Sequence, residues 1–407
     1  MLEYQSHILK NGIRIVHKPS LGPVSYGGYI INAGTRDEQT DEYGMAHLVE
    51  HLLFKGTTKR RPYHIINRME NVGGELNAYT NKEETVIYSI FLEEYFDRAF
   101  ELLTDLTFNS QFPQHEIEKE IDVIIDEIHS YEDSPSELIF DEFENLIFAN
   151  SQLEHNILGE PSLLQTFDTQ KARLFTKKHY IPSNIVFFSV GKTNFKKIIR
   201  LAENSLQKIE EANYDWKRIV PSVVKPKQVE ILKDTSQAHV MIGSIAYHLH
   251  DKKRRPLMLL NNILGGPGMN SRLNISLREK HGYVYNVESS VNHYTDTGLF
   301  AIYFGSDKQN SEKCVKLIHK ELKKMRDKQL SSTQLHAAKK QLVGQMAIAN
   351  DQSENVALAL GKSFLHYGHI NSLDEIFKQI EALTSSQLLD VANEIFDEKA
   401  LSSLIYI

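Results

Sequence analysis

The sequence predicts an α+β protein built from two similar halves. The chain has 407 residues, of which 41% are hydrophobic, so it is too long for one ordinary core and rich enough in apolar residues to form more. Strand-like and helix-like stretches alternate, which indicates a sheet with helices packed on one side. The same order of strand, helix, strands and paired helices can be traced in both halves.

The chain begins with a predicted β-hairpin. Asn11 and Gly12 lie between two strand-like stretches, residues 7–10 and 13–16, and Asn-Gly is typical of a two-residue hairpin turn. The preceding residues have neither the apolar run of a secretory signal nor the Arg-rich character of a transit peptide. We therefore expect a cytoplasmic protein.

A buried helix is predicted around residues 47–51, which read His-Leu-Val-Glu-His. On a helix, His47, Glu50 and His51 share one face. Two imidazoles can bind one metal ion, and the neighbouring carboxylate can accept a proton from a metal-bound water. In a chain with 18 His such a pentamer can also arise by chance, so its surroundings have to support the metal interpretation.

The surroundings favour burial. Apolar residues flank the three polar ones on both sides, and an unpaired imidazole or carboxylate among them would be costly. Asp41 is the expected helix cap, and Gly44 and Gly56 bracket the segment. The apolar neighbours are Ala46, Leu48, Val49, Leu52, Leu53 and Phe54.

A third metal ligand is expected on a second helix, because a catalytic zinc normally has three protein ligands and a water. Isoleucines recur at helical spacing within residues 113–131. Glu120 and Glu127 are seven residues apart on that helix and therefore share a face. Glu127 is the candidate ligand, and Glu116, Glu118, Asp122 and Asp126 are expected to be solvated.

The second half repeats this order but not the metal motif. Strand 84–91 and the two following helices, 97–107 and 113–131, correspond to strand 297–304 and helices 312–326 and 332–348. With Phe112 set against Leu330, Glu120 falls on Ala338 and Glu127 on Gln345. Residues 259–264, the counterpart of the histidine helix, contain no metal-binding pair. Only the first half is expected to bind metal.

The predicted domains are residues 1–212, which carry the metal site, and residues 227–407, which do not. The linker between them, residues 213–226, contains Pro221. The formal charge of −7 and the pI of about 6.2 argue against a nucleic-acid partner. The single Cys314 excludes an intrachain disulfide and fits a reducing compartment. No apolar run is long enough to cross a bilayer.

Together these motifs resemble the inverzincin peptidases of the pitrilysin type, especially the branch of mitochondrial processing peptidase and its two-domain bacterial relatives. The resemblance runs almost end to end. His47 and His51 match the zinc ligands, and Glu50 matches the general base. Glu127 matches the distant glutamate ligand, 75 residues beyond His51. Glu120 matches a second acidic position on one helix face with Glu127, where it would orient that ligand.

Two further segments carry the resemblance. Residues 73–80 resemble the substrate-binding strand of the family, which implies that Leu76, Asn77, Ala78 and Tyr79 bind peptide. Residues 265–273, 277–279 and 282–285 resemble its other signature. Arg278 and Tyr285 match the arginine and tyrosine of that signature, with Tyr283 as the alternative tyrosine.

The resemblance implies two halves that face one another as a clamshell around a closed chamber, with one Zn²⁺ per chain. It implies an endopeptidase in which zinc activates a water and Glu50 takes the proton, while Arg278 and Tyr285 stabilise the negative oxygen of the intermediate. Extended or unfolded peptides would bind as an added strand. Because this chain carries both motifs, we expect a self-sufficient enzyme, most simply a homodimer, without a membrane partner.

Two alternative functions and one question of substrate preference stay open. The chain could be a non-catalytic scaffold or processing partner of the same fold. It could also be a closed metal site without turnover, for which His64 or His129 would supply a fourth ligand. If the protein is an enzyme, acidic groups such as Glu83 and Glu84 could line the chamber and favour basic peptides.

Overall fold

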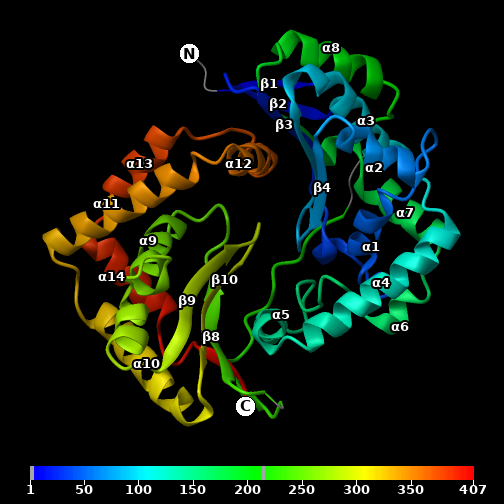
Figure 1. Cartoon of the computed structure of the whole chain (residues 1–407). Coiled ribbons are helices and arrows are strands. Elements are labelled where there is room, and N and C mark those ends of the chain that lie inside the picture. The colour runs from blue at the N-terminus through cyan, green and yellow to red at the C-terminus, as the bar shows by residue number, and fades with distance from the viewer. Residues whose placement is uncertain (1–3, 213–215, 234) are drawn as a thin grey trace. The chain divides into compact units, whose positions relative to one another are not determined.

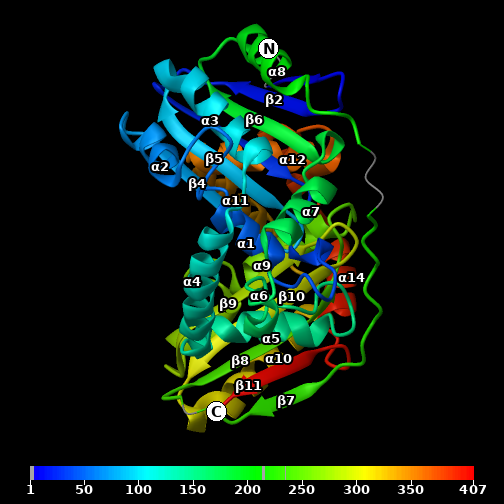
Figure 2. The ribbon, with the colours of Figure 1, turned by 90° about the vertical axis from the view of Figure 1, so that its right-hand side faces the viewer.

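The computed structural model describes residues 4–212, 216–233 and 235–407. It divides into two compact units, each with its own sheet (Figures 1 and 2). The first unit comprises Met1–Ile128, His155–Arg218 and Ala349–Ile370, and the second comprises His129–Glu154, Ile219–Ile348 and Asn371–Ile407. Residues 213–215 of the predicted linker lie outside the described residues.

The sheet of the first unit has the strand order β1-β2-β6-β3-β5-β4. The predicted hairpin is present, since β1 pairs antiparallel with β2, but the predicted two-residue turn is wrong. The N–H of Leu9 donates to the carbonyl of Ile13, so the turn is longer, and Gly12 adopts a φ of 95° within it. The pair β2 and β6 is parallel, and all other neighbours are antiparallel. The strands are β1 Gln5–Ile8, β2 Arg14–Pro19, β3 Val24–Ile31, β4 Glu75–Thr80, β5 Thr85–Leu92 and β6 Ile185–Gly191.

The sheet of the second unit repeats this topology without an equivalent of β1. Its order is β7-β11-β8-β10-β9. Among the described strands, its one parallel pair is β7 with β11, which corresponds to β2 with β6 in the first sheet. The predicted α+β fold with two similar halves is therefore confirmed. The strands are β7 Gln228–Ile231, β8 Ala238–Ala246, β9 Val284–His293, β10 Gly298–Ser306 and β11 Ser402–Tyr406.

The helices that the sequence predicts from apolar periodicity are present. The helix predicted at residues 113–131 is α4, and the helix predicted at residues 332–348 is its counterpart α11. Among the described residues, none of the helices is both long and apolar enough to cross a membrane. The helices are α1 Met45–Leu52, α2 Pro62–Glu70, α3 Phe96–Asn109, α4 Gln114–Glu132, α5 Pro135–Ile147, α6 Pro161–Leu164, α7 Thr169–His179, α8 Phe195–Leu206, α9 Arg254–Gly265, α10 Ser311–Asp327, α11 Ser332–Ala349, α12 Ser353–Tyr367, α13 Leu373–Glu381 and α14 Ser385–Ile395.

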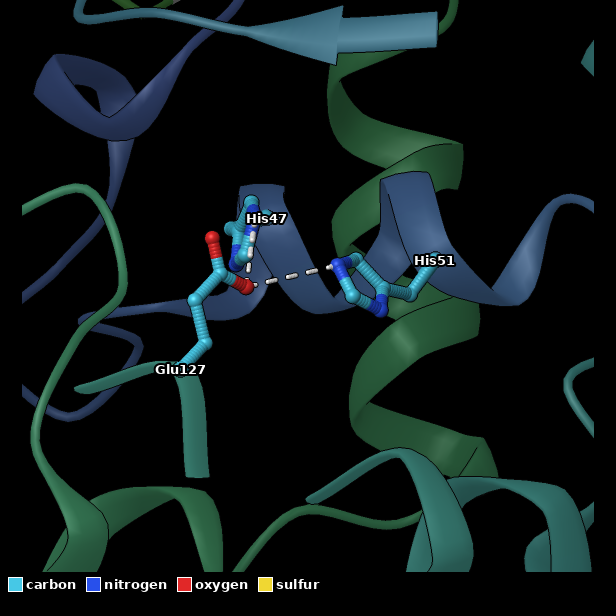
Figure 3. A group of neighbouring side chains, drawn as sticks. All are labelled: His47, His51 and Glu127. Carbon is cyan, nitrogen blue, oxygen red and sulfur yellow. Dashed lines mark ion pairs between the residues drawn. The ribbon is translucent and has the colours of Figure 1, made fainter. Parts of the chain in front are cut away.

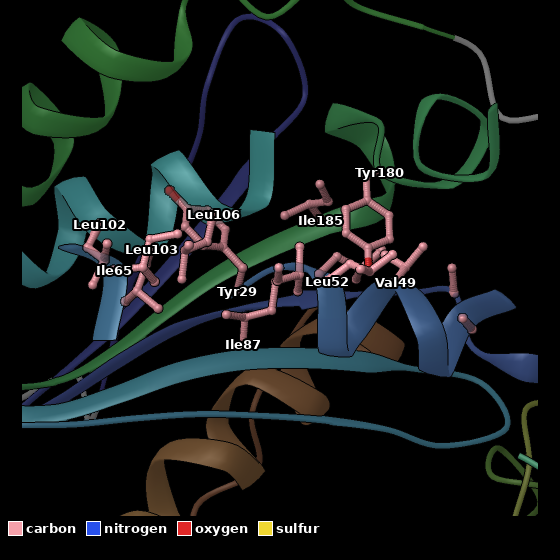
Figure 4. Close-up of a cluster of buried hydrophobic side chains, with 14 of the residues drawn as sticks. Tyr29, Val49, Leu52, Ile65, Ile87, Leu102, Leu103, Leu106, Tyr180 and Ile185 are labelled. Carbon is pink, nitrogen blue, oxygen red and sulfur yellow. The ribbon is translucent and has the colours of Figure 1, made fainter. Parts of the chain in front are cut away.

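Helices α1 and α3 pack on one face of the first sheet (Figure 4). Leu48, Val49 and Leu52 of α1 are fully buried beside strand residues such as Tyr29 and Ile87. Truncating one of these side chains to alanine would cost about 2–5 kcal/mol. The apolar side of α1 is thus held against the core, which leaves its polar residues on the other side.

The opposite face of the first sheet is covered by α12, a helix from the second half of the sequence. Leu360 and Phe364 pack against Phe188 and its neighbours on β3 and β6. Gly361 permits the close approach, because a Cβ there would lie 2.6 Å from the Cδ1 of Ile30. Helices therefore cover both faces of this sheet, in contrast to the one-sided layer expected from the sequence.

A reciprocal exchange occurs in the second unit. Helix α5, which follows α4 in the first half of the chain, packs on β8, β10 and β11 of the second sheet. The compact units therefore differ from the halves drawn along the sequence in two segments, residues 129–154 and 349–370. The reason is that each sheet has a second apolar face, which a helix of the other half buries.

Polar contacts hold α12 in place. Glu84, in the turn between β4 and β5, is hydrogen-bonded to His366 and lies 3.0 Å from the Nζ of Lys362. The hydroxyl of Tyr88 donates to Glu354 at 2.8 Å. Because the Glu84 side chain is buried within this network, it is not an exposed acidic group, and the expectation that it lines a substrate chamber is wrong.

Glu83 is likewise paired with basic side chains inside the protein. Its carboxylate lies 2.6 Å from Arg36 and 3.7 Å from Arg218, and all three side chains are largely buried. The guanidinium groups neutralise the charge that a basic peptide would otherwise meet. Neither of the two residues named for a preference for basic peptides is therefore placed to provide one.

The contacts of Glu84 with His366 and Lys362 predict that the protein loses stability in acid. Burial by itself would raise the pKa of Glu84, but the hydrogen bond from His366 and the charge of Lys362 outweigh it and hold the pKa at about 2. Because this value is below the ordinary 4.5, the stabilisation is complete above about pH 4.5 and is lost as the pH falls toward about 2. It amounts to about 3 kcal/mol.

The test is thermal unfolding of the wild type and Glu84→Gln at several pH values. We expect the variant to be less stable at neutral pH, and the difference between the two proteins to shrink as the pH is lowered below about 4.5. Hydrogen exchange in α12 should rise in the variant. A difference in stability that does not change with pH would contradict the prediction.

Candidate metal centre

Helix α1 presents His47, Glu50 and His51 on the face that is not packed into the core. Its neighbours at Leu48, Val49 and Leu52 are fully buried, so the orientation of the helix is set by its apolar side. His47 is itself 8% exposed. The local sequence therefore decides which way the two imidazoles point.

Helix α4 brings Glu127 to the same point (Figure 3). The Oε2 of Glu127 lies 3.9 Å from the Nε2 of His47 and 3.9 Å from the Nε2 of His51. Among the described residues, this is the one group of three or more His, Cys, Asp or Glu side chains whose ligand atoms gather, all within 4.8 Å of one another. The whole group belongs to the first unit.

The three side chains fit a zinc ion. Two imidazole nitrogens and one carboxylate oxygen are ligands that zinc accepts. In a tetrahedral site with ligand distances of about 2.1 Å, the ligand atoms lie about 3.4 Å apart. The two observed spacings of 3.9 Å therefore need to close by only about half an ångström.

Glu120 contacts His51 and not Glu127. Its Oε2 lies 3.0 Å from the Nδ1 of His51, and its Oε1 lies 2.6 Å from the Nζ of Lys55. A carboxylate at Nδ1 holds the proton on that nitrogen and leaves Nε2 free to bind a metal. The sequence predicts an orienting role for Glu120, and in the structure its contact is with the histidine.

The electrostatics suit metal binding. Burial, together with the nearby His51, lowers the pKa of His47 to about 3, so its imidazole is neutral near pH 7, as a ligand must be. Burial raises the pKa of Glu50, although hydrogen bonding to Thr80 and the proximity of His51 oppose this. The Oε2 of Glu50 is buried and has no hydrogen-bond partner among the described residues.

No fourth protein ligand joins the group within the part of the chain that the structure describes. His64 and His129, which a closed site would need, are both exposed and are not members of it. Three protein ligands with room for a water are typical of catalytic zinc. This geometry favours the catalytic interpretation over a closed structural site.

The predicted substrate strand, β4, is the terminal strand of the first sheet and packs beside α1. Leu76 and Ala78 face the core that contains α1, whereas Tyr79 faces α12, where Lys362 lies 5.3 Å from its ring. Asn77 pairs with Tyr88 of β5. An edge strand offers main-chain groups to an incoming peptide, so the location of β4 is suited to the predicted role.

The predicted arginine and tyrosine lie together in the second unit. Arg278 belongs to a π-helical turn, Asn274–Glu279, and its guanidinium lies 5.6 Å from the ring of Tyr285, which is 84% exposed. Tyr283 instead packs against the core of that unit. The geometry thus pairs Arg278 with Tyr285, and the catalytic role of the pair stays a prediction.

Sequence reasoning missed two residues at the start of α1. The helix begins after Gly44, and the carboxylate that accepts hydrogen bonds from its first turn belongs to Glu38, not to Asp41. His155 contacts Glu38 from a distant part of the chain. The signal for Glu38 was weak, because it lies six residues before the helix cap, beyond the usual capping position.

Comparisons with known proteins identify the family of this chain. A family profile described as Insulinase (Peptidase family M16) matches residues 14–161, and one described as Peptidase M16 inactive domain matches residues 166–342. A protein of Rickettsia bellii named as an uncharacterised zinc protease is 31% identical over 402 residues, which are 98% of this chain and 96% of the relative. This chain belongs to peptidase family M16.

Two other similar proteins extend the comparison. The mitochondrial-processing peptidase subunit beta of Caenorhabditis elegans is 26% identical over 98% of this chain and 88% of that protein. The crystal structure of a protease from Helicobacter pylori has a TM-score of 0.91 and 22% identity, and the match covers 99% of both chains. It shows that the two proteins share one fold over nearly the whole chain. The family resemblance drawn from the motifs is confirmed.

The contact between Glu120 and His51 predicts that Glu120→Gln weakens zinc binding by about 10- to 100-fold, because the amide no longer holds the imidazole with a charge. The zinc dissociation constant should be measured by competition with a chromophoric chelator. Glu118→Gln is the matched control, since Glu118 is exposed on the same helix. Equal zinc affinity in the wild type and Glu120→Gln would refute the orienting role.

Proposed function

We propose that this M16 chain is a zinc-dependent endopeptidase that hydrolyses extended or unfolded peptides. The observation that carries the proposal is the gathering of His47, His51 and Glu127, with Glu50 on the same helix face. One zinc ion per chain is proposed at this group. The names of relatives as zinc proteases support the metal and the reaction class.

Each residue has a proposed task. A zinc ion held by His47, His51 and Glu127 would polarise the scissile carbonyl and lower the pKa of a coordinated water toward about 7. Glu50 accepts the proton of the attacking water and returns it to the leaving amine. Glu120 orients His51 through its Nδ1. Glu50 is half-buried, and its Oε2 is buried without a hydrogen-bond partner among the described residues, which leaves this oxygen available to take a proton.

Substrate binding is assigned to the edge strand β4, including Leu76, Asn77, Ala78 and Tyr79. A peptide that adds to this edge uses main-chain hydrogen bonds, which read little of its sequence. Such binding requires an extended backbone, so folded proteins are poor substrates. The location of β4 beside α1 supports this assignment, because it brings a bound peptide close to the metal ligands.

The first test is Glu50→Gln with an unstructured fluorogenic peptide library. We expect kcat to fall by about 10²- to 10⁴-fold, because the amide cannot accept a proton, while the zinc content stays near that of the wild type. Removal of zinc by a chelator should abolish cleavage, and re-addition should restore it. If zinc-loaded wild type and Glu50→Gln both fail to cleave the library, the scaffold interpretation replaces the peptidase.

Arg278 and Tyr285 are proposed to donate hydrogen bonds to the substrate oxygen that becomes negative. Tyr285→Phe should lower kcat by about 10²-fold or more, the loss expected for one such donor, with little change in stability because Tyr285 is exposed. Tyr283→Phe is the control and should leave kcat unchanged. If the two variants behave alike, the assignment of the tyrosine is wrong.

We also propose a homodimer located in the cytoplasm. The single, buried Cys314 is compatible with a reducing compartment, and one relative is named as a subunit. Because this chain carries both the zinc motif and the Arg278 and Tyr285 pair, a second copy is the simplest partner. Analytical ultracentrifugation tests the assembly, and a monomer at micromolar concentration would contradict it.

A further inference from the structure

The first turn of α1 is capped from outside the helix. Gly44, the residue at the cap position, has no side chain to accept the free amides and adopts a φ of 96°. Glu38 supplies the acceptors instead: its Oε2 accepts from the N–H of Gly44 at 3.0 Å and its Oε1 from that of Ala46 at 2.7 Å. These are groups that a helix terminus otherwise leaves unsatisfied.

Glu38 is fully enclosed and has one further partner. The Nε2 of His155 lies 2.9 Å from the Oε2 of Glu38 and 2.9 Å from the carbonyl oxygen of Thr35. The side chain of Glu38 has no exposed surface. A buried carboxylate is tolerated only when such donors surround it, so Glu38, His155 and the helix amides depend on one another.

The loop that contains His155 also closes over the start of α1. The ring of His155 stacks on Tyr43 with centroids 3.8 Å apart. Gly159 lies against Gly44, and a Cβ on Gly159 would be 2.6 Å from the Cα of Gly44. Lys82 donates to the carbonyl of His155. Residues from three separate places in the chain therefore meet at this helix end.

We propose that Glu38 and His155 are positioning residues for the metal centre, which hold the first turn of α1 in the geometry that presents His47. The inference rests on the proposed function, because it assumes a metal at His47, His51 and Glu127. His47 follows directly after Ala46, whose amide is bound by Glu38. The helix has only eight residues, so any fraying of its first turn displaces a ligand.

A purely structural role would lower stability without changing the metal centre. A positioning role predicts a change at the metal itself, since ligand geometry sets both the affinity and the electronic spectrum of the bound ion. Glu38→Gln distinguishes the structural role from the positioning role. The amide oxygen of the glutamine can accept from only one of the two N–H groups, of Gly44 or Ala46, and its NH2 group would face the other N–H, which is unfavourable.

The experiment measures zinc affinity by chelator competition and the visible absorption of the cobalt(II)-loaded protein. We expect Glu38→Gln to raise the zinc dissociation constant by about 10- to 100-fold, to alter the cobalt spectrum and to lower kcat more than it changes KM. The matched control is Asp105→Asn. Asp105 is equally buried in the same unit and accepts from Thr57 and Arg60, but it does not contact α1 through these bonds. The control should lower the melting temperature and leave the cobalt spectrum unchanged.

A second pair of variants covers the case in which Glu38→Gln does not fold. His155→Ala removes a donor from Glu38 and should weaken zinc binding, whereas His155→Gln retains a donor and should weaken it less. If the zinc-loaded wild type cleaves peptides and all these variants keep its zinc affinity and cobalt spectrum, the positioning role is refuted and the proposed function stands. If the wild type neither binds zinc nor cleaves peptides, the proposed function itself fails.

Discussion

The burial of one side of α1 is the constraint on which the candidate site depends. Leu48, Val49 and Leu52 are fully enclosed, so the helix cannot rotate without exposing several apolar side chains, each worth about 1.5–3 kcal/mol. The polar residues between them are thereby turned toward α4. The hydrophobic core thus sets the direction of the metal ligands, and Glu127 on α4 completes the group.

The carboxylates inside the first unit differ in whether their oxygens have hydrogen-bond partners. Glu38, Glu83 and Glu84 all have basic or N–H partners inside the protein, which satisfies the hydrogen-bonding requirement of a buried polar group. Glu50 differs from them, because one of its oxygens is buried without a hydrogen-bond partner among the described residues. An unsatisfied acceptor beside two imidazoles is costly for stability and is useful for taking a proton from a bound water.

The two sheets share a topology, but the exchange of helices makes the units interdependent. Helix α12 buries the second face of the first sheet, and α5 buries a face of the second sheet. Each unit therefore completes its core only with a segment supplied from the other half of the sequence. The candidate metal site lies entirely within the first unit, whereas the corresponding helix of the second unit, α9, contains no His, Cys, Asp or Glu.

The sequence by itself determined the elements whose signals are local. The period of apolar residues predicted α4, and the repeated order of elements predicted α10 and α11. The spacing within residues 47–51 placed His47, Glu50 and His51 on one helix face. Glu127 as the partner came from the family resemblance, because helical spacing alone did not distinguish it from other acidic residues. Only the tertiary structure decided the contact of Glu120 with His51, the capping of α1 by Glu38 and His155, and the packing of α12. The physical reason is that helical and strand periodicity depends on neighbours in the chain, whereas these contacts join residues that folding brings together from distant positions.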